Sequence, residues 1–470
     1  MSAQYPWMTP ADIEASAIAY AGDPAFRNWL GAVARFRDKR LRDIEQHSVR
    51  LMAESPGKQL RERVDRFMRS YEVQWWHLHS EWMRKGGALK GVEMIARRAT
   101  FFELWKAANE GCPLPWELDP GKACSEGFAR HEMPKRGGRG SRRCFSFGVA
   151  GRTRQKIVDA ALKAAGCGLC RAQFIYAEGG RLEAIDEIAR AINANPMLSH
   201  YAKLDLANCF DNIDLARAHE FLPVRRKVVQ HTIGIDRREA SGRRNHGRVL
   251  YPTSTVASAL HRTSSDDAES VSILSPDKVL DHLAIRYPLL LPQGAACSPR
   301  VAYWLIEKGL PPLDPARAFM YGDDLFLLGQ SEREVRAEAS WFGTLFSTHA
   351  AGPLPVGRVE IGATAGGAGF LGIEIIHEQV SPPLPGLRVS AVALSVNEES
   401  RRRFMENARE LISRGVAYGD ESLSEARVLI QGFLNAAPRQ DRISLFLEVL
   451  QIANDSEADL NVLYGGIDMH

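Results

Sequence analysis

The chain has 470 residues, of which 45% are hydrophobic and 25% charged, a composition typical of a folded globular protein that excludes wholesale disorder. This length allows more than one domain and a sizeable core. The formal net charge is only +3, so the local distribution of charge matters more than the total. No segment has the length of a transmembrane helix, residues 1–10 lack the features of a signal peptide, and the cysteines are scattered. We therefore expect a cytoplasmic protein without a membrane partner.

The first third of the chain has apolar residues at helical spacing and predicts a helical N-terminal extension over residues 1–112. One stretch of it combines three tryptophans with two histidines, namely Trp75, Trp76, His77, His79 and Trp82. Such a cluster could stack bases or bind a metal, but on a helix it is more typical of a core between helices. We therefore interpret it as core.

A Pro/Gly-rich and increasingly basic linker follows over residues 113–140. The basic residues continue beyond it and include Arg136 and Arg143, which makes this segment a candidate for binding anions. An amphipathic helix is predicted to open at Gly179–Gly180 and to end near Asn193, with Arg181 in its first turn.

Two segments carry carboxylates next to predicted strands. A short strand ends at Asp205, and a polar turn with Asp211 follows. Further along, two apolar runs meet at a turn that contains Gly322, Asp323 and Asp324, which predicts a hairpin with acidic residues at its tip. Adjacent carboxylates repel each other unless a cation lies between them, so these residues indicate a divalent metal site.

Between the acidic segments lie a basic insertion and a Pro/Gly loop. Residues 215–288 are rich in arginine, including Arg225, Arg226, Arg243 and Arg244, and are the best candidates for contacts with a nucleic-acid backbone. The loop carries Gln293 and Gly294 and leads into a predicted helix over residues 300–310.

In this order, the Asp205 segment, the Pro-Gln-Gly loop and the Tyr-Gly-Asp-Asp hairpin resemble motifs A, B and C of reverse transcriptases. The resemblance covers residues 135–437 and implies an α+β right-hand polymerase. Its fingers would span residues 113–200 with a basic hairpin, its palm residues 201–380 with an antiparallel sheet and helices, and its helical thumb residues 381–470. Residues 366–374 resemble the primer-grip turn, and residues 431–435 resemble a thumb helix.

The resemblance also implies roles for individual residues. Asp205 and Asp323 would hold two Mg²⁺ ions, with Mn²⁺ as the alternative, while Asp324 is a weaker candidate and the Leu206 carbonyl completes one ion's ligands. Phe210 would lie beneath the sugar of the incoming nucleotide and exclude a 2′-hydroxyl, which favours dNTPs. Gln293 and Gly294 would contact the nucleotide. Arg143 and Arg136 would bind its triphosphate, and Arg181 would contact the template.

One feature departs from the family, which usually has a lysine after motif C to protonate the leaving pyrophosphate. This chain has no lysine after Lys308. His349 and Arg358 are the candidates for that role, although arginine is a poor proton donor at neutral pH.

Short strings typical of retron enzymes are absent from the sequence, and no ribonuclease H or integrase-like segment is evident. By exclusion, the chain resembles bacterial defence-associated and abortive-infection reverse transcriptases, related to those of group II introns and retrons. The expected partners are an RNA template in the form of a structured non-coding RNA, a DNA product, dNTPs and further copies of the chain. The open alternatives are a group II intron-like mobile-element enzyme, an RNA-dependent RNA polymerase and a catalytically inactive RNA-binding scaffold.

Overall fold

A computed structural model describes residues 8–48, 57–84, 92–124, 126–134, 141–166, 172–215, 220–236, 289–380, 389–418, 420–456 and 458. The chain forms two compact units. The first unit comprises Met1–Gly168, Asn208–Leu310 and Thr348–Leu354, and the second unit comprises Leu169–Ala207, Pro311–Ser347 and Pro355–His470. Both contain helices, and all pairings between the named strands of the described ranges are antiparallel. This confirms the α+β class, whereas the right-hand arrangement and the domain bounds stay predictions.

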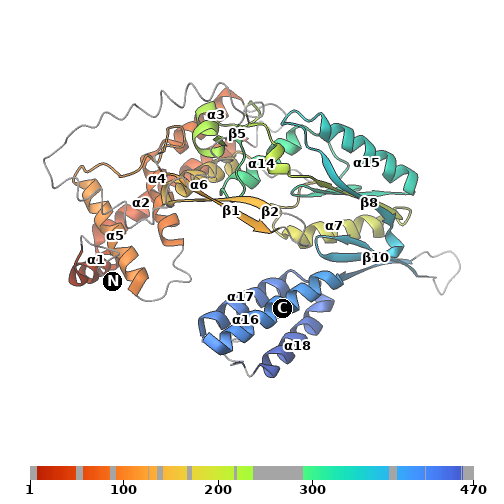
Figure 1. Ribbon diagram of the computed structural model, residues 1–470. Coiled ribbons are helices and arrows are strands. Elements are labelled where there is room, and N and C mark those ends of the chain that lie inside the picture. Colours follow the sequence, from red (N-terminus) through yellow and green to blue (C-terminus); the bar gives the residue numbers. More distant parts are fainter. Residues whose placement is uncertain are drawn as a thin grey trace. The chain divides into compact units, whose positions relative to one another are not determined.

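The first unit contains helices that pack against one another (Figure 1). They are α1 (Pro10–Gly22), α2 (Pro24–Ser48), α3 (Lys58–Met68), α4 (Tyr71–Arg84), α5 (Val92–Asn109) and α6 (Val149–Ala164). Trp75 and Trp82 of α4 are 0% and 1% exposed and lie among other aromatic rings. The interpretation as core is therefore confirmed for Trp75, His77 and Trp82, whereas Trp76 and His79 are half-buried. No helix in the described parts of either unit is both long and apolar enough to cross a membrane.

The rest of the first unit contains two short sheets and several short helices. Strand β1 (Phe128–Pro134) pairs with β2 (Ser141–Phe147), so part of the predicted linker is a strand rather than an irregular segment. The Phe128 ring packs against the rings of Phe145 and Phe147 on β2, with centroid distances of 5.6 and 6.0 Å, and this contact anchors the start of the strand pair. The remaining elements are α8 (Cys209–Asn212), α10 (Arg226–Val228), η2 (Val229–Ile233), β4 (Ile235–Asp236), β5 (Leu289–Leu290) and α14 (Ser298–Lys308).

The second unit is built on a four-stranded sheet with the strand order β6-β7-β3-β8. These strands are β3 (His200–Leu206), β6 (Ala318–Tyr321), β7 (Asp324–Gly329) and β8 (Val356–Ala363). Helix α7 (Gly180–Ala194) contacts β6, and helix α15 (Glu332–Ser347) contacts β3, β7 and β8. Side chains alternate along β3, so the ring of Tyr201 faces the α7 side while Ala202 and Leu204 face the opposite side.

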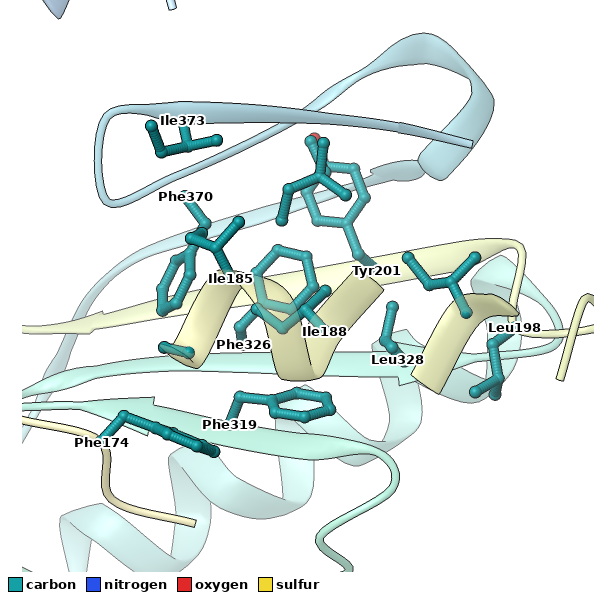
Figure 2. Close-up of a cluster of buried hydrophobic side chains, with 14 residues drawn as sticks. Phe174, Ile185, Ile188, Leu198, Tyr201, Phe319, Phe326, Leu328, Phe370 and Ile373 are labelled. Carbon is teal, nitrogen blue, oxygen red and sulfur yellow. The ribbon is translucent and has the colours of Figure 1, made fainter. Parts of the chain in front are cut away.

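Aromatic rings form the core on the α7 side of this sheet, as Figure 2 shows. The rings of Tyr201 and Phe326 stack with their centroids 5.5 Å apart, and Phe370 lies 5.0 Å from Phe326. Ile185 and Ile188 of α7 complete the cluster and are fully buried. Burying side chains of this size contributes about 1.5–3 kcal/mol each, which anchors β3 and β7 beside each other.

A second sheet and a helical bundle complete this unit. Strand β10 (Ile373–Val380) lies between β9 (Ala368–Phe370) and β11 (Val389–Val396), and the 3₁₀ turn η3 (Thr364–Gly366) precedes β9. The bundle consists of α16 (Glu398–Tyr418), α17 (Asp420–Asn435) and α18 (Arg439–Asp455), which lie side by side (Figure 1). Its core includes Phe404, Ile430 and Val449, each at most 3% exposed.

Candidate active site

The predicted acidic hairpin is present in the second unit. Tyr321 and Asp324 are register partners, so Gly322 and Asp323 form a two-residue turn between β6 and β7. Gly322 has a φ of 71° at the first turn position, the pattern of a type II′ turn, which favours glycine there. The turn therefore leaves Asp323 at the tip and starts β7 with Asp324.

A buried glutamine holds this turn in place. The side chain of Gln173 donates to the Gly322 carbonyl at 3.0 Å and accepts from the Gly322 amide at 2.8 Å. Gln173 is only 3% exposed, so its amide group satisfies both backbone groups of Gly322 away from water. Sequence reasoning missed this residue, because nothing in the local pattern around Gln173 links it to a hairpin far along the chain.

Three charged residues form a row across the sheet beside that turn. Asp205 on β3 is the register partner of Asp324 on β7 and of Arg358 on β8. Directly opposed residues of antiparallel strands project from the same face, so two carboxylates and one guanidinium share this end of the sheet. Asp205 is exposed, and Asp323 and Asp324 are half-buried. Opposed like charges destabilise a sheet, and a bound cation would remove this cost.

A β-bulge sets the position of Arg358. The register between β3 and β8 shifts after Asp205, which leaves Gly357 as an extra residue. A Cβ atom added to Gly357 would lie 2.9 Å from the Ala207 Cβ atom and 3.3 Å from its Cα, so this close approach requires glycine. Bulges often redirect a side chain beside an active site, and this one precedes the arginine opposite Asp205.

Glu360 connects this arginine to the interior of the sheet. Its carboxylate lies 3.1 Å from an Nη of Arg358 and accepts from the Tyr201 hydroxyl at 3.1 Å. Burial and the neighbouring Glu360 raise the pKa of Tyr201 to about 12, so the phenol stays protonated and donates. The Arg358 side chain is nevertheless 71% exposed, which leaves it accessible to an anion.

The carboxylates fit a hard divalent cation. The described parts of the chain contain no group of three or more His, Cys, Asp or Glu side chains close enough to hold a metal ion by themselves. Mg²⁺ is commonly held by one or two carboxylates and completes its ligands with water and substrate phosphates. The opposed pair of Asp205 and Asp324, with Asp323 next to it, matches that requirement.

The first unit brings together several residues predicted to handle the nucleotide. Arg143 of β2 lies 3.6 Å from the Asp211 carboxylate in α8, directly after Phe210. The Phe210 ring meets the edge of Tyr303 at 6.4 Å. Phe210 is half-buried, so its ring is partly covered by protein and partly open.

The predicted loop is also tied to β2. The Phe145 amide donates to the Gln293 carbonyl at 2.7 Å. Gly294 has a φ of 97°, and an added Cβ atom would lie 2.5 Å from the Phe145 carbonyl oxygen. Glycine is required there for both reasons, and the loop therefore lies against the strand that carries Arg143.

The arginines predicted to contact nucleic acid differ from one another in exposure and in their partners. Arg225 forms an ion pair with Asp65 at 2.9 Å, and Arg226 is exposed. Burial raises the pKa of Asp65, although Arg225 and Arg69 act against that shift. The guanidinium of Arg181 donates to two backbone carbonyls of the second unit. Three further candidates, Arg136, Arg243 and Arg244, lie outside the described residues.

His349 does not fit the proposed role of proton donor to a leaving group. Its Nε2 lies 3.0 Å from the Ile306 carbonyl, and its Nδ1 accepts from the Ala351 amide at 3.1 Å. The side chain is buried, and this burial lowers its pKa. Both ring nitrogens are therefore engaged in the neutral form, and His349 is a structural residue.

Comparisons with known proteins show limited similarity. No protein-family model and no curated protein matches the sequence. Solved structures that it resembles include apo telomerase from Candida tropicalis truncated from its C-terminal domain, with 12% identity and a TM-score of 0.30 over 53% of each chain. The chain thus spans about half the length of that telomerase.

Two further telomerases are similar at the same level. Candida albicans telomerase in complex with a TWJ fragment of telomeric RNA has 9% identity and a TM-score of 0.31 over 77% of this chain and 65% of that chain. The apo Candida tropicalis telomerase has 10% identity and a TM-score of 0.30 over 98% of this chain and 94% of that chain. TM-scores at this level do not establish a shared fold.

Proposed function

We propose that this protein is an RNA-directed DNA polymerase that adds dNTPs to a primer 3′-hydroxyl. The observation that carries the proposal is the opposition of Asp205 and Asp324 at one end of the sheet, with Asp323 in the adjoining turn. Carboxylates opposed across one end of a sheet, of which Asp205 is exposed, are best explained by a metal-dependent reaction on phosphates.

In this proposal Asp205 and Asp323 hold Mg²⁺ or Mn²⁺, with Asp324 and the Leu206 carbonyl as additional ligands. The bound ions would lower the pKa of the primer hydroxyl and neutralise charge on the triphosphate. The protein's own contribution is positional, because Gln173 fixes the turn that carries Asp323 and the aromatic core fixes β3 beside β7.

Residues of the first unit are proposed to select and bind the nucleotide. Phe210 follows Asp205 by five residues in the chain, and its half-buried ring would exclude the 2′-hydroxyl of an rNTP. Arg143, now paired with Asp211 over 3.6 Å, would exchange that carboxylate for a phosphate of the dNTP. Gln293 and Gly294 lie on the loop tied to β2 and would contact the same nucleotide.

The biological setting is part of the proposal. We place the enzyme in the cytoplasm of a bacterium, where it would act in antiphage defence with a structured non-coding RNA as template, in copies that can associate. Arginines such as Arg225 and Arg226 would contact the RNA or the DNA product, since exposed arginines suit a phosphate backbone.

The direct test is extension of a labelled primer on an RNA template by the purified chain with Mg²⁺, comparing dNTPs with rNTPs. Incorporation of dNTPs should occur in the wild type and disappear in the Asp323→Ala, Asp324→Ala double variant. A matched control is Glu187→Gln on α7, a partly exposed residue that pairs with Arg190. Nucleic acid that copurifies should be sequenced alongside.

Other outcomes would redirect the proposal. Incorporation of rNTPs alone would indicate an RNA polymerase, and a copurified intron RNA would favour a mobile-element enzyme. Tight RNA binding without incorporation, even after the copurified RNA is added back, would indicate a catalytically inactive scaffold.

A further inference from the structure

Arg181 joins three elements of the second unit that are distant in sequence. It lies in the first turn of α7, and one Nη donates to the Leu371 carbonyl at 3.2 Å. The other Nη donates to the Ala436 carbonyl, directly after α17. The residue is half-buried, so water screens these charge-assisted hydrogen bonds less than it would at an exposed site.

The first acceptor belongs to a strained turn. Phe370 and Ile373 are register partners, so Leu371 and Gly372 form the two-residue turn between β9 and β10, with φ values of 51° and 81°. Positive φ at both positions defines a type I′ turn, which normally carries asparagine or glycine first. A leucine there is unfavourable and persists only where the surroundings hold it.

Two further contacts hold the same turn. The Asn397 amide, at the start of α16, donates to the Gly372 carbonyl at 3.1 Å. A Cβ atom on Gly372 would lie 2.7 Å from the Ser400 Oγ, so α16 approaches the turn closely. The turn is thus fixed from α7 by Arg181 and from the start of α16 by the Asn397 amide and the Ser400 side chain.

The second acceptor lies at the C-terminal end of α17. The last carbonyls of a helix lack partners within the helix and carry partial negative charge, so a guanidinium is favourable there. Arg442 of α18 serves the same helix end, because it donates to the Ala437 carbonyl at 3.1 Å. The hydrogen bond from Arg442 to Ala437 stays within the helical bundle. Arg181 differs because it binds both the end of α17 and the β9–β10 turn.

We infer that Arg181 is a positioning residue that couples the β9–β10 turn to the end of α17 and thereby holds the three-helix bundle to the sheet. The role of this coupling in catalysis rests on the proposed polymerase function. In that polymerase the β9–β10 turn is the primer-grip turn and the three-helix bundle is the thumb, so the coupling fixes one relative to the other. Arg181 then acts on the primer and template through these two elements, in place of the direct template contact predicted from sequence.

Hydrogen–deuterium exchange of the full chain tests the coupling without reference to activity. In Arg181→Ala, exchange should rise by about tenfold both at residues 368–375 and at residues 430–437, since each loses a charge-assisted hydrogen bond. Arg442→Ala is the matched control and should raise exchange at residues 430–437 only. If Arg181→Ala left the β9–β10 turn as protected as in the wild type, the inference would be wrong.

Primer extension tests the consequence for the reaction. Arg181→Ala should bind primer–template about tenfold more weakly and add fewer nucleotides per binding event, with the KM for dNTP unchanged. Arg181→Lys keeps the positive charge without the guanidinium fork and should recover only part of the lost primer–template binding. This variant also controls for a folding defect in Arg181→Ala. A raised KM for dNTP with unchanged primer binding would contradict the inference, whereas absence of extension by the wild type would contradict the proposed polymerase and leave the exchange result standing.

Discussion

The sheet end of the second unit and helix α4 of the first unit both contain residue types that perform chemistry, but their surroundings are opposite. Asp205 is exposed and faces a second carboxylate across the sheet. In α4, the carboxylate of Glu81 is buried and accepts from Arg152 at 2.6 Å and from Arg84 at 2.9 Å. A buried charge requires such partners, and a satisfied one is a structural element.

The histidines of α4 avoid a buried charge by staying neutral. Burial lowers the pKa of His77 to about 3 and that of His79 to about 4. Both rings are therefore neutral at pH 7, and the Nε2 of His79 lies 2.7 Å from the Tyr20 hydroxyl. The comparison teaches that an exposed carboxylate opposed by a second carboxylate, rather than residue type alone, separates a candidate site from a polar core.

The largest effect is expected from Asp205→Asn. Primer extension should fall on the order of 10³-fold, because a charged ligand is lost where charge develops. The free energy of unfolding should stay the same or rise slightly, because repulsion with Asp324 is removed. Extension assays and urea unfolding of the same preparation measure both quantities. An inactive variant that is also unfolded would leave Asp205 with a structural role instead.

A tryptophan pair tests the opposite region. Trp82→Ala in α4 should lower the free energy of unfolding by about 3–5 kcal/mol, because the ring is 1% exposed and its removal leaves a cavity. Trp341→Ala on α15 is the control, since that ring is 50% exposed, and it should change stability by less than about 0.5 kcal/mol. Similar losses in both variants, measured by urea unfolding, would contradict the assignment of α4 to the core.

Acid should destabilise the first unit through α4. Because the folded-state pKa values of His77 and His79 lie at about 3 and about 4, below the ordinary 6.5, the unfolded chain binds protons first as the pH falls. The free energy of unfolding therefore keeps its full value above pH 6.5 and falls progressively below it. Each histidine lowers it by about 2 kcal/mol at pH 5.

Thermal unfolding at pH 7 and pH 5 measures this effect. His77→Gln should show a smaller fall in midpoint than the wild type. His131→Gln, at an exposed position of β1, should behave as the wild type does. An equal fall in all three proteins would indicate that other groups govern acid sensitivity.

Phe210→Ala should relax the choice of sugar. The ratio of kcat/KM for dNTP to that for rNTP should fall by about 10- to 200-fold, the range for removing a steric contact in a pocket. Tyr303→Phe keeps the ring that meets Phe210 and should leave the ratio unchanged. If the ratio were unchanged in Phe210→Ala, the Phe210 ring would have a packing role only and would not select the sugar.

The smallest effect concerns the third member of the charged row. Arg358→Gln removes a positive charge opposite Asp205, so the Mg²⁺ concentration for half-maximal extension should fall by about two- to fivefold. The KM for dNTP should rise in the same variant if the exposed guanidinium also binds phosphate. Arg336→Gln on α15, an exposed arginine paired with Glu332, is the control. A higher Mg²⁺ requirement would show that Arg358 orients the carboxylates instead.

Features that depend on neighbouring residues were predictable before the structure. The helix predicted over residues 300–310 is α14 (Ser298–Lys308), the strand that ends at Asp205 is β3, and the acidic hairpin turns at Gly322 as expected. Apolar periodicity and turn chemistry are local properties, so they can be read from a short window of sequence.

Tertiary structure alone decided which charges meet. The pairing of β3 with β7 and β8 places Asp205 between Asp324 and Arg358, and no local pattern specifies that register. The same holds for the two hydrogen bonds between Gln173 and Gly322, because these residues are distant in sequence. It also holds for His349, whose burial removed it as a proton donor, because burial depends on the packing of segments that are distant in sequence.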